Sequence, residues 1–164
     1  MPRSLGSLEV SFNSPQCGWM SIGFRNAENE FHTTTAHSPY ENALPELMRI
    51  LTETLDPASS TDEWTLQWNR DPEAYDFNFR RKDKELTFEI YQFPTEERKG
   101  SQRELVFSHC GPISEIVSAF AATFDQLYQD RETDEFEFNW RRPFPLRQYQ
   151  EFKERTAKVP NQGR

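Results

Sequence analysis

Glycine and cysteine are both scarce in this sequence, and each scarcity excludes a class of protein. The 6 glycines among 164 residues are scattered, so neither a glycine-rich phosphate-binding loop nor a Gly-x-Ser-x-Gly nucleophile motif is present. The 2 cysteines, Cys17 and Cys110, form no Cys-x-x-Cys pair, and a disulfide framework is not indicated. Nucleotide-binding and serine-hydrolase signatures are therefore absent, and reduced thiols are expected.

Long apolar runs are also missing from the chain. No stretch approaches the roughly 18 apolar residues of a membrane helix, and the start of the chain lacks the apolar core of a signal peptide. The 27 acidic and 19 basic residues give a net charge of -8, which repels phosphate backbones and anionic lipids. We therefore expect a cytoplasmic protein with no nucleic-acid or membrane partner. The charge permits a basic protein partner, although acidic balance is also a common solubility device.

Aromatic residues are abundant, in contrast. The chain has 14 Phe, 5 Tyr and 4 Trp, beside a mean hydropathy of -0.90, so a core of rings inside a very polar surface is expected. The length fits one domain that buries roughly two-thirds of its unfolded surface. We predict a single domain over 1–164, with an ordered core over about 5–155 and a frayed tail over 156–164.

Two kinds of hydrophobic periodicity predict the elements. Apolar and polar residues alternate with period two, which is typical of half-buried strands, in seven segments: 8–12, 20–24, 31–35, 64–68, 75–79, 86–90 and 105–107. Apolar residues recur at three- and four-residue spacing over 44–55 and 113–128, which predicts two amphipathic helices. Ser38, Pro39 and Glu41 are typical of the start of the first helix.

The end of the chain is less regular. Pro145 opens a last short helix that carries Leu146, Tyr149 and Phe152. The segment 136–140 alternates over only five residues, so both a short strand and an ordered loop remain open for it.

These elements predict an α+β fold. We expect one two-layer arrangement, in which a mostly antiparallel sheet of about seven strands carries two main helices on one face and a short C-terminal helix. The opposite face is then polar. Its predicted residues are Ser21, Gly23, Arg25, Thr65, Gln67, Asp76, Asn78, Arg80, Thr87, Glu89 and Tyr91.

Cys110 is the strongest enzymatic candidate in the sequence. It lies between His109 and the predicted start of the long helix, and both an imidazolium and a helix dipole lower the pKa of a thiol. Adjacent residues of a strand point to opposite faces, however, so we predict that Cys110 serves packing and is not a nucleophile. The histidines His32, His37 and His109, together with the cysteines, match no metal-ligand spacing, so neither a metal nor a cofactor is predicted.

A second candidate is the aromatic and basic segment 140–145. Trp140, Arg141, Arg142 and Phe144 have the residue types of interaction hot spots. In the alternative interpretation, which we favour, Trp140 and Phe144 fill the core while the flanking prolines fix the path of the chain.

Several short motifs resemble a family of small acidic bacterial proteins to which no activity is assigned. They are Gly18-Trp19, Asp71-Pro72-Glu73 before Tyr75, and the closing Trp-x-x-Pro-Phe-Pro formed by Trp140, Pro143, Phe144 and Pro145. The resemblance implies an α+β fold and a bacterial source. Small acidic α+β proteins also occur among immunity proteins, which neutralise secreted toxins.

Two functions are consistent with these features. The first is a non-catalytic protein-binding module, of the immunity-like kind. The second is a small-molecule-binding protein or an enzyme that uses Cys110 and His109. The oligomeric state is left open by the sequence.

Overall fold

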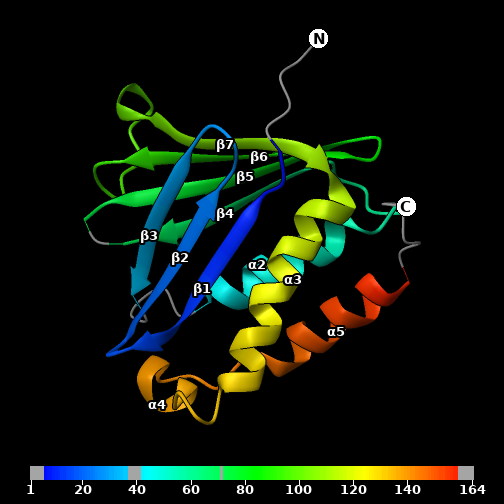
Figure 1. Cartoon of the computed structure of the whole chain (residues 1–164). Coiled ribbons are helices and arrows are strands. Elements are labelled where there is room, and N and C mark those ends of the chain that lie inside the picture. Colours follow the sequence, from blue (N-terminus) through cyan, green and yellow to red (C-terminus); the bar gives the residue numbers. More distant parts are fainter. Residues whose placement is uncertain (1–5, 37–41, 71, 159–164) are drawn as a thin grey trace.

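The computed structural model describes residues 6–36, 42–70 and 72–158, and its elements confirm an α+β fold with antiparallel sheets (Figure 1). The strands are β1 (Glu9–Gln16), β2 (Trp19–Arg25), β3 (Glu30–Ala36), β4 (Glu63–Asn69), β5 (Ala74–Lys82), β6 (Glu85–Phe93) and β7 (Glu104–Pro112). The helices are α2 (Ala43–Thr54), α3 (Ile113–Asp130), α4 (Phe136–Trp140) and α5 (Leu146–Ala157), with a 3-10 turn η1 at Gly100–Gln102.

The seven strands form two sheets, so the expected single sheet is wrong. The first sheet has the order β1-β2-β3, and the second has the order β4-β5-β6-β7. Helix α2 separates β3 from β4 in the chain, and these two strands form no ladder of backbone hydrogen bonds with each other. Alternation shows which face of each strand is buried, but it does not show which strands pair, because both sheets bury one apolar face.

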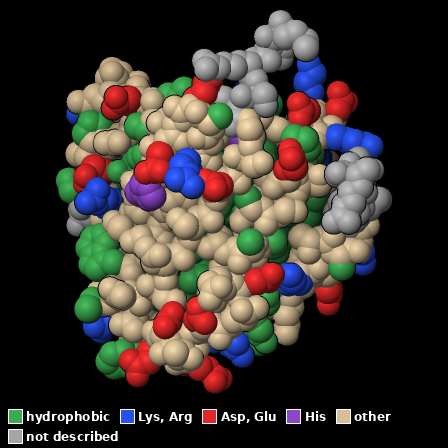
Figure 2. All heavy atoms as spheres, viewed as in Figure 1, with side chains coloured by type: hydrophobic (Ala, Val, Ile, Leu, Met, Phe, Trp, Pro, Cys, Tyr) green, Lys and Arg blue, Asp and Glu red, His purple; other side chains and the backbone are tan. Residues whose placement is uncertain are grey.

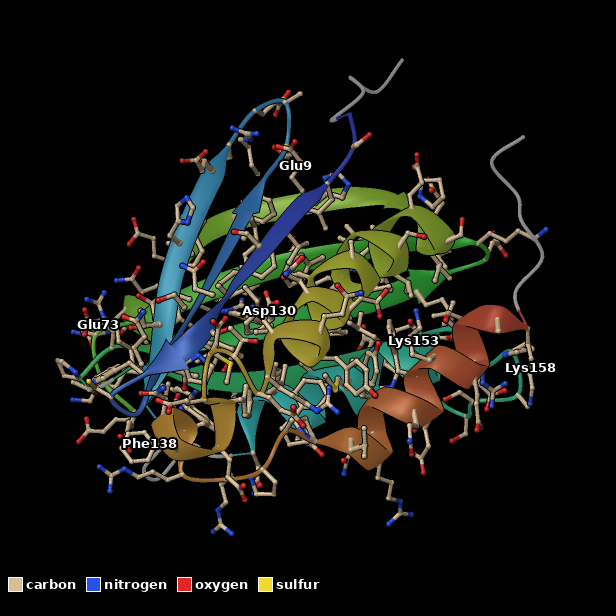
Figure 3. The ribbon with its side chains drawn as sticks, turned by 60° about the horizontal axis from the view of Figure 1, so that its bottom comes forward. Glu9, Glu73, Asp130, Phe138, Lys153 and Lys158 are labelled. Carbon is tan, nitrogen blue, oxygen red and sulfur yellow. The ribbon has the colours of Figure 1, made fainter. Side chains whose placement is uncertain are left out.

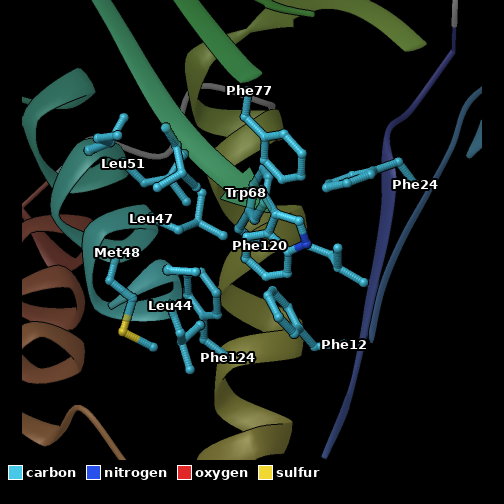
Figure 4. Packing of buried hydrophobic residues seen from close by; sticks show 14 of the residues in the cluster. Phe12, Phe24, Leu44, Leu47, Met48, Leu51, Trp68, Phe77, Phe120 and Phe124 are labelled. Atoms are coloured by element: carbon cyan, nitrogen blue, oxygen red, sulfur yellow. The ribbon is translucent and has the colours of Figure 1, made fainter. Parts of the chain in front are cut away.

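The inner faces of the two sheets meet in a core of aromatic rings (Figure 4). Phe24 of β2 lies at its centre, with ring centroids 5.7 Å from Phe77, 5.1 Å from Phe88 and 5.7 Å from Phe107. Helix α3 adds Phe120, whose ring lies 5.9 Å from that of Phe24. The three-stranded sheet and α3 therefore both pack on one face of the four-stranded sheet (Figure 1).

The helical stripes are buried as their spacing predicts. Phe120 and Phe124 of α3 are fully buried, as are Leu44, Leu47 and Leu51 of α2. Helix α5 packs on the outside of α2 and α3.

A short hydrogen-bonded chain ties α5 to α3. The hydroxyl of Tyr149 donates to Asp125 Oδ1 at 2.5 Å, and Lys153 Nζ lies 3.1 Å from the other oxygen of the same carboxylate. Burial, followed by the hydrogen bond to Asp125, raises the pKa of Tyr149 well above its ordinary value, so the phenol keeps its proton and donates.

Polar side chains fasten the two sheets to each other. The side-chain amide of Asn26, in the β2–β3 turn, donates to the backbone oxygen of Ser108 at 2.9 Å. The side-chain amide of Asn29 donates to the backbone oxygen of Val106 at 3.0 Å. At the other end of β3, Thr35 Oγ1 donates to the oxygen of Asn69 at 2.8 Å. The junction is thus both an aromatic core and a set of directed hydrogen bonds.

Several local predictions need correction or fall outside the described residues. Strand β7 runs through nine residues, Glu104–Pro112, whereas the sequence predicted a short strand with apolar residues over 105–107 and an end at Gly111-Pro112. The segment 136–140 is a short helix, neither the strand nor the loop that the sequence left open. The start of the first helix was predicted from Ser38, Pro39 and Glu41, which lie outside the described residues.

Candidate functional site

The structure places His109 and Cys110 on opposite faces of β7. His109 is 2% exposed and faces the core, whereas Cys110 is exposed on the outer face, with its Sγ 3.5 Å from Thr87 Oγ1. The predicted separation of these two side chains is therefore confirmed. A thiol and an imidazole that point to opposite sides of a sheet cannot share a proton directly.

The surroundings of His109 favour a neutral ring. Its Nδ1 lies 3.1 Å from the side-chain nitrogen of Asn26, which also bonds Ser108. Burial lowers the pKa of His109 from its ordinary value, and the nearby carboxylate of Glu115 opposes that shift only in part. In the neutral ring, Nδ1 accepts a hydrogen bond from the side-chain N–H of Asn26, so His109 acts as a structural link between the two sheets.

The aromatic and basic segment 140–145 is divided between core and surface. Trp140 is 2% exposed and Phe144 is 8% exposed, and the rings of Phe144 and Phe136 lie 5.4 Å apart. These two residues fill the core, as the favoured interpretation predicts. Arg141 and Arg142 are exposed.

Helix α4 is short but firmly held. Glu135 before it and Arg141 after it both have left-handed backbone conformations, with φ of 52° and 69°. The backbone oxygen of Asn139 accepts from Gly18 N at 2.7 Å, while its side-chain oxygen accepts from Cys17 N at 3.3 Å. The turn between β1 and β2 therefore holds α4 from one side.

Phe138 projects from this helix into solvent (Figure 3). It is 79% exposed, although Phe136 and Trp140 on the same helix are 1% and 2% exposed. Two helical residues correspond to a rotation of about 200°, so burying positions 136 and 140 directs position 138 outward. The exposure of Phe138 is thus imposed by two buried neighbours.

Acidic residues are frequent in the sequence around Phe138. Between positions 130 and 142 the chain has five acidic residues and three basic ones. Glu132, Glu135 and Glu137 are exposed, and none of them forms an ion pair with another described residue. Arg131, by contrast, is occupied by Tyr128, since its guanidinium lies 4.0 Å from that ring centroid. We call Phe138 with these three glutamates the α4 ridge.

The outer face of the four-stranded sheet has a different character. Its polar side chains pair across neighbouring strands or with arginines of the β6–β7 connection. The pairs are Arg80 with Glu89 at 3.4 Å, Thr65 with Asn78 at 3.0 Å, Arg98 with Asp76 at 2.8 Å, and Arg103 over the ring of Tyr91 at 3.4 Å. The predicted polar face is therefore real for β4 to β6, but Ser21, Gly23 and Arg25 belong to the separate three-stranded sheet.

An open hollow of about 930 Å³ lies where α2 and α5 end and α3 begins. Its four basic lining residues, Arg81, Lys84, Arg155 and Lys158, are balanced by four acidic ones, Asp62, Asp83, Glu85 and Glu115. Arg81 is fully engaged, because it bonds Asp62 and the backbone oxygens of Thr54, Asp56 and Thr61. Neither Cys110 nor His109 lines this hollow.

Sequence reasoning missed Phe138, although one signal was present. Phe136, Phe138 and Trp140 follow each other at spacing two, which is consistent with a strand, but Phe136 and Trp140 also fit one helix face at spacing four. The five-residue length left the two periods indistinguishable.

No described helix has the length and apolarity that crossing a membrane requires. Within 6–36, 42–70 and 72–158, no group of three or more His, Cys, Asp or Glu side chains could hold a metal ion, and His37 lies outside these ranges. Comparison with known proteins gives no match to a family model, to a curated protein or to a solved structure.

Proposed function

We propose that this protein is a non-catalytic binding module whose α4 ridge docks on a basic protein surface. The observation that carries the proposal is the 79% exposure of Phe138 on a helix that the core holds at both neighbouring positions. A solvent-exposed ring of this kind gains apolar burial only when another molecule covers it.

Rigidity makes Phe138 suited to recognition. Binding costs free energy when a loop or side chain must be ordered, and part of that cost is already met where the backbone is fixed before the partner arrives. Helix α4 is fixed by the burial of Phe136 and Trp140 and by the hydrogen bonds from Cys17 and Gly18 to Asn139. Phe138 therefore has the properties of an anchor that inserts into an apolar pocket.

Charge indicates the kind of partner. Glu132, Glu135 and Glu137 lie close to Phe138 in the sequence, are exposed and form no ion pair with another described residue, and the whole chain has a net charge of -8. Complementary charge accelerates association and disfavours wrong partners. A partner with an apolar pocket bordered by Lys and Arg fits this surface, and an immunity-like protein that covers a basic toxin is one form of the proposal.

The test is capture through the ridge, with an exposed residue elsewhere as the control. Benzoylphenylalanine placed at position 138 is photo-crosslinked in extracts of the source cells, and the same group at Leu105, which is 50% exposed on the outer face of the four-stranded sheet, is the matched control. A protein captured at 138 is then purified and titrated calorimetrically against the unmodified chain and its variants.

The proposal expects Phe138→Ala to weaken binding about 30-fold or more, which is the scale of a hot-spot residue. Glu137→Lys should slow association and reduce its salt dependence. Leu105→Ala should leave affinity unchanged. Equal capture at positions 138 and 105, or an affinity that Phe138→Ala leaves unchanged, would show that the α4 ridge is not the binding site.

A further inference from the structure

Two separate sheets have four edge strands, and such edges are hazards because their outward N–H and C=O groups can pair with another chain. The outer strands are β1 and β3 in one sheet and β4 and β7 in the other. In an antiparallel pair only every second residue bonds its neighbour, so the register shows which groups point outward.

Side chains or helices cover two of these edges. On β1 the outward amide of Phe12 donates to Thr123 Oγ1 of α3 at 2.7 Å, and α3 packs along this strand. On β7 the outward backbone oxygens of Val106 and Ser108 accept hydrogen bonds from the side-chain amides of Asn29 and Asn26, respectively.

The β4 edge is guarded at both ends. Thr61 Oγ1 donates to the oxygen of Glu63 at 2.9 Å and accepts from its amide at 3.2 Å, while Thr35 covers the oxygen of Asn69. Between these two hydrogen-bonded ends of β4, only Thr65 and Gln67 have outward backbone groups. A strand added there would meet a threonine at each end.

Among residues 6–36, 42–70 and 72–158, a short contact covers the β3 edge at its first residue only. The bond from Asn26 N to Asn29 O closes the β2–β3 hairpin, and the register then pairs Phe31 and Thr33 with β2 while His32 and Thr34 point outward. Asn29 Oδ1 accepts from the amide of Glu30. Beyond it, the described part of the chain offers these outward groups one long contact, 3.5 Å from Thr33 Oγ1 to the oxygen of Thr34.

The side chain of His32 is folded away from this edge. Its ring lies over Gly23 of the neighbouring strand, where an added Cβ would approach Nδ1 to 2.5 Å. Glycine at position 23 thus lets the ring lie inward. Figure 2 shows the resulting surface, in which uncharged side chains occupy the middle of the three-stranded face.

We propose that an extended segment of a protein partner adds to β3 as a fourth strand of the small sheet. This surface is distinct from the α4 ridge and does not depend on it. The segment carries Lys or Arg at the position opposite Glu30. The row Glu9, Arg25 and Glu30 holds two carboxylates against one guanidinium, and the other basic side chain near Glu30 is His32, with Nε2 at 3.2 Å from its carboxylate.

The probe is a phage-displayed library of extended peptides, selected against the full chain. Selected peptides are expected to alternate, to contain basic residues, and to bind through their backbone. Thr34→Pro removes an outward N–H and obstructs the edge, but it removes no bond to β2. Thr34→Val keeps the N–H and is the matched control.

The proposal expects affinity to fall about tenfold or more in Thr34→Pro and to stay unchanged in Thr34→Val and in Phe138→Ala. Bound peptide should slow amide exchange at His32 and Thr34, while Thr33 and Thr35, already bonded to β2, serve as internal controls. Peptides whose affinity is unchanged in Thr34→Pro, or a selection that yields no binding peptide, would overturn the proposal. So would a homodimer of the wild-type chain that Thr34→Pro dissociates, since the occupant would then be a second copy.

Discussion

The two sheets of this molecule treat their outer faces differently. On the four-stranded sheet, polar side chains pair across neighbouring strands, as Arg80 does with Glu89 and Thr65 with Asn78. On the three-stranded sheet, small residues such as Ser11 and Gly23 lie in the middle of the face, and charge is gathered at the row of Glu9, Arg25 and Glu30. The polar groups of the four-stranded face are paired with one another. The three-stranded sheet instead leaves the β3 edge and the rigid helix α4 available to a partner.

This contrast suggests a division of labour. The four-stranded sheet supports the core, because its inner face carries Trp68, Phe77 and Phe88, all fully buried. The three-stranded sheet also contributes rings to that core, yet it holds α4 at one end and the β3 edge along one side. Recognition is therefore expected on the smaller sheet.

The largest expected effect comes from removing the ring that joins the two sheets. Phe24→Ala should lower the free energy of unfolding by about 3–5 kcal/mol, because four neighbouring rings lose a shared partner and a cavity remains. Urea melts followed by tryptophan fluorescence measure the loss. A change below about 1 kcal/mol would mean that the sheets do not share one core.

Much of the fold could be predicted because burial imposes a period on the sequence. The stripes of α2 and α3 and the alternation of β1 to β6 follow directly from which face is buried. The division into two sheets could not be predicted, because hydrogen-bond partners leave no mark in alternation. Only the first part of β7 is marked by apolar residues in the sequence, because Ser108 to Pro112 lack the apolar alternation of the other strands.

The candidate site was only partly predictable for a related reason. Opposite orientation of His109 and Cys110 follows from strand geometry, and burial of Trp140 and Phe144 follows from the flanking prolines. Phe138 was missed because its exposure depends on tertiary contacts of Phe136, Trp140 and Asn139. Edge protection was equally hidden, since Asn26 and Asn29 looked like ordinary turn residues.

A second prediction distinguishes two roles of the Asn26 side chain, which are to link the two sheets and to stabilise the β2–β3 turn. Asn26→Ala should cost about 1–3 kcal/mol, since the Ser108 oxygen and His109 Nδ1 both lose a donor. Asn26→Asp keeps the oxygen that accepts from Glu28 N and Asn29 N, but it cannot donate to β7. Similar losses in thermal melts of both variants support a junction role, and wild-type stability of Asn26→Asp would assign Asn26 to the turn alone.

A third prediction concerns pH. Because burial lowers the pKa of His109 below its ordinary 6.5, the unfolded chain takes up a proton at a pH where the folded protein does not. This residue should therefore make the free energy of unfolding fall as the pH drops below about 6.5, and contribute no pH dependence above it. Urea melts from pH 5 to 8 should show a flatter profile for His109→Gln, with exposed His32→Gln as the control. Parallel profiles for wild type and His109→Gln would contradict this origin.

The smallest expected effect is on the stability of the ridge itself. Phe138→Ala should change the free energy of unfolding by less than about 0.5 kcal/mol, because an exposed ring buries little surface in the free protein. A clear loss in chemical denaturation would assign the ring a structural role, in conflict with its exposure.

The most direct test of the division of labour is amide hydrogen exchange of the chain with and without a captured partner. The account predicts new protection over 135–142, which includes α4 and its flanking residues. It predicts none at amides whose side chains form the outer face of the four-stranded sheet, such as Tyr91 and Cys110. Protection confined to that outer face, with α4 exchanging as fast as in the free protein, would contradict it.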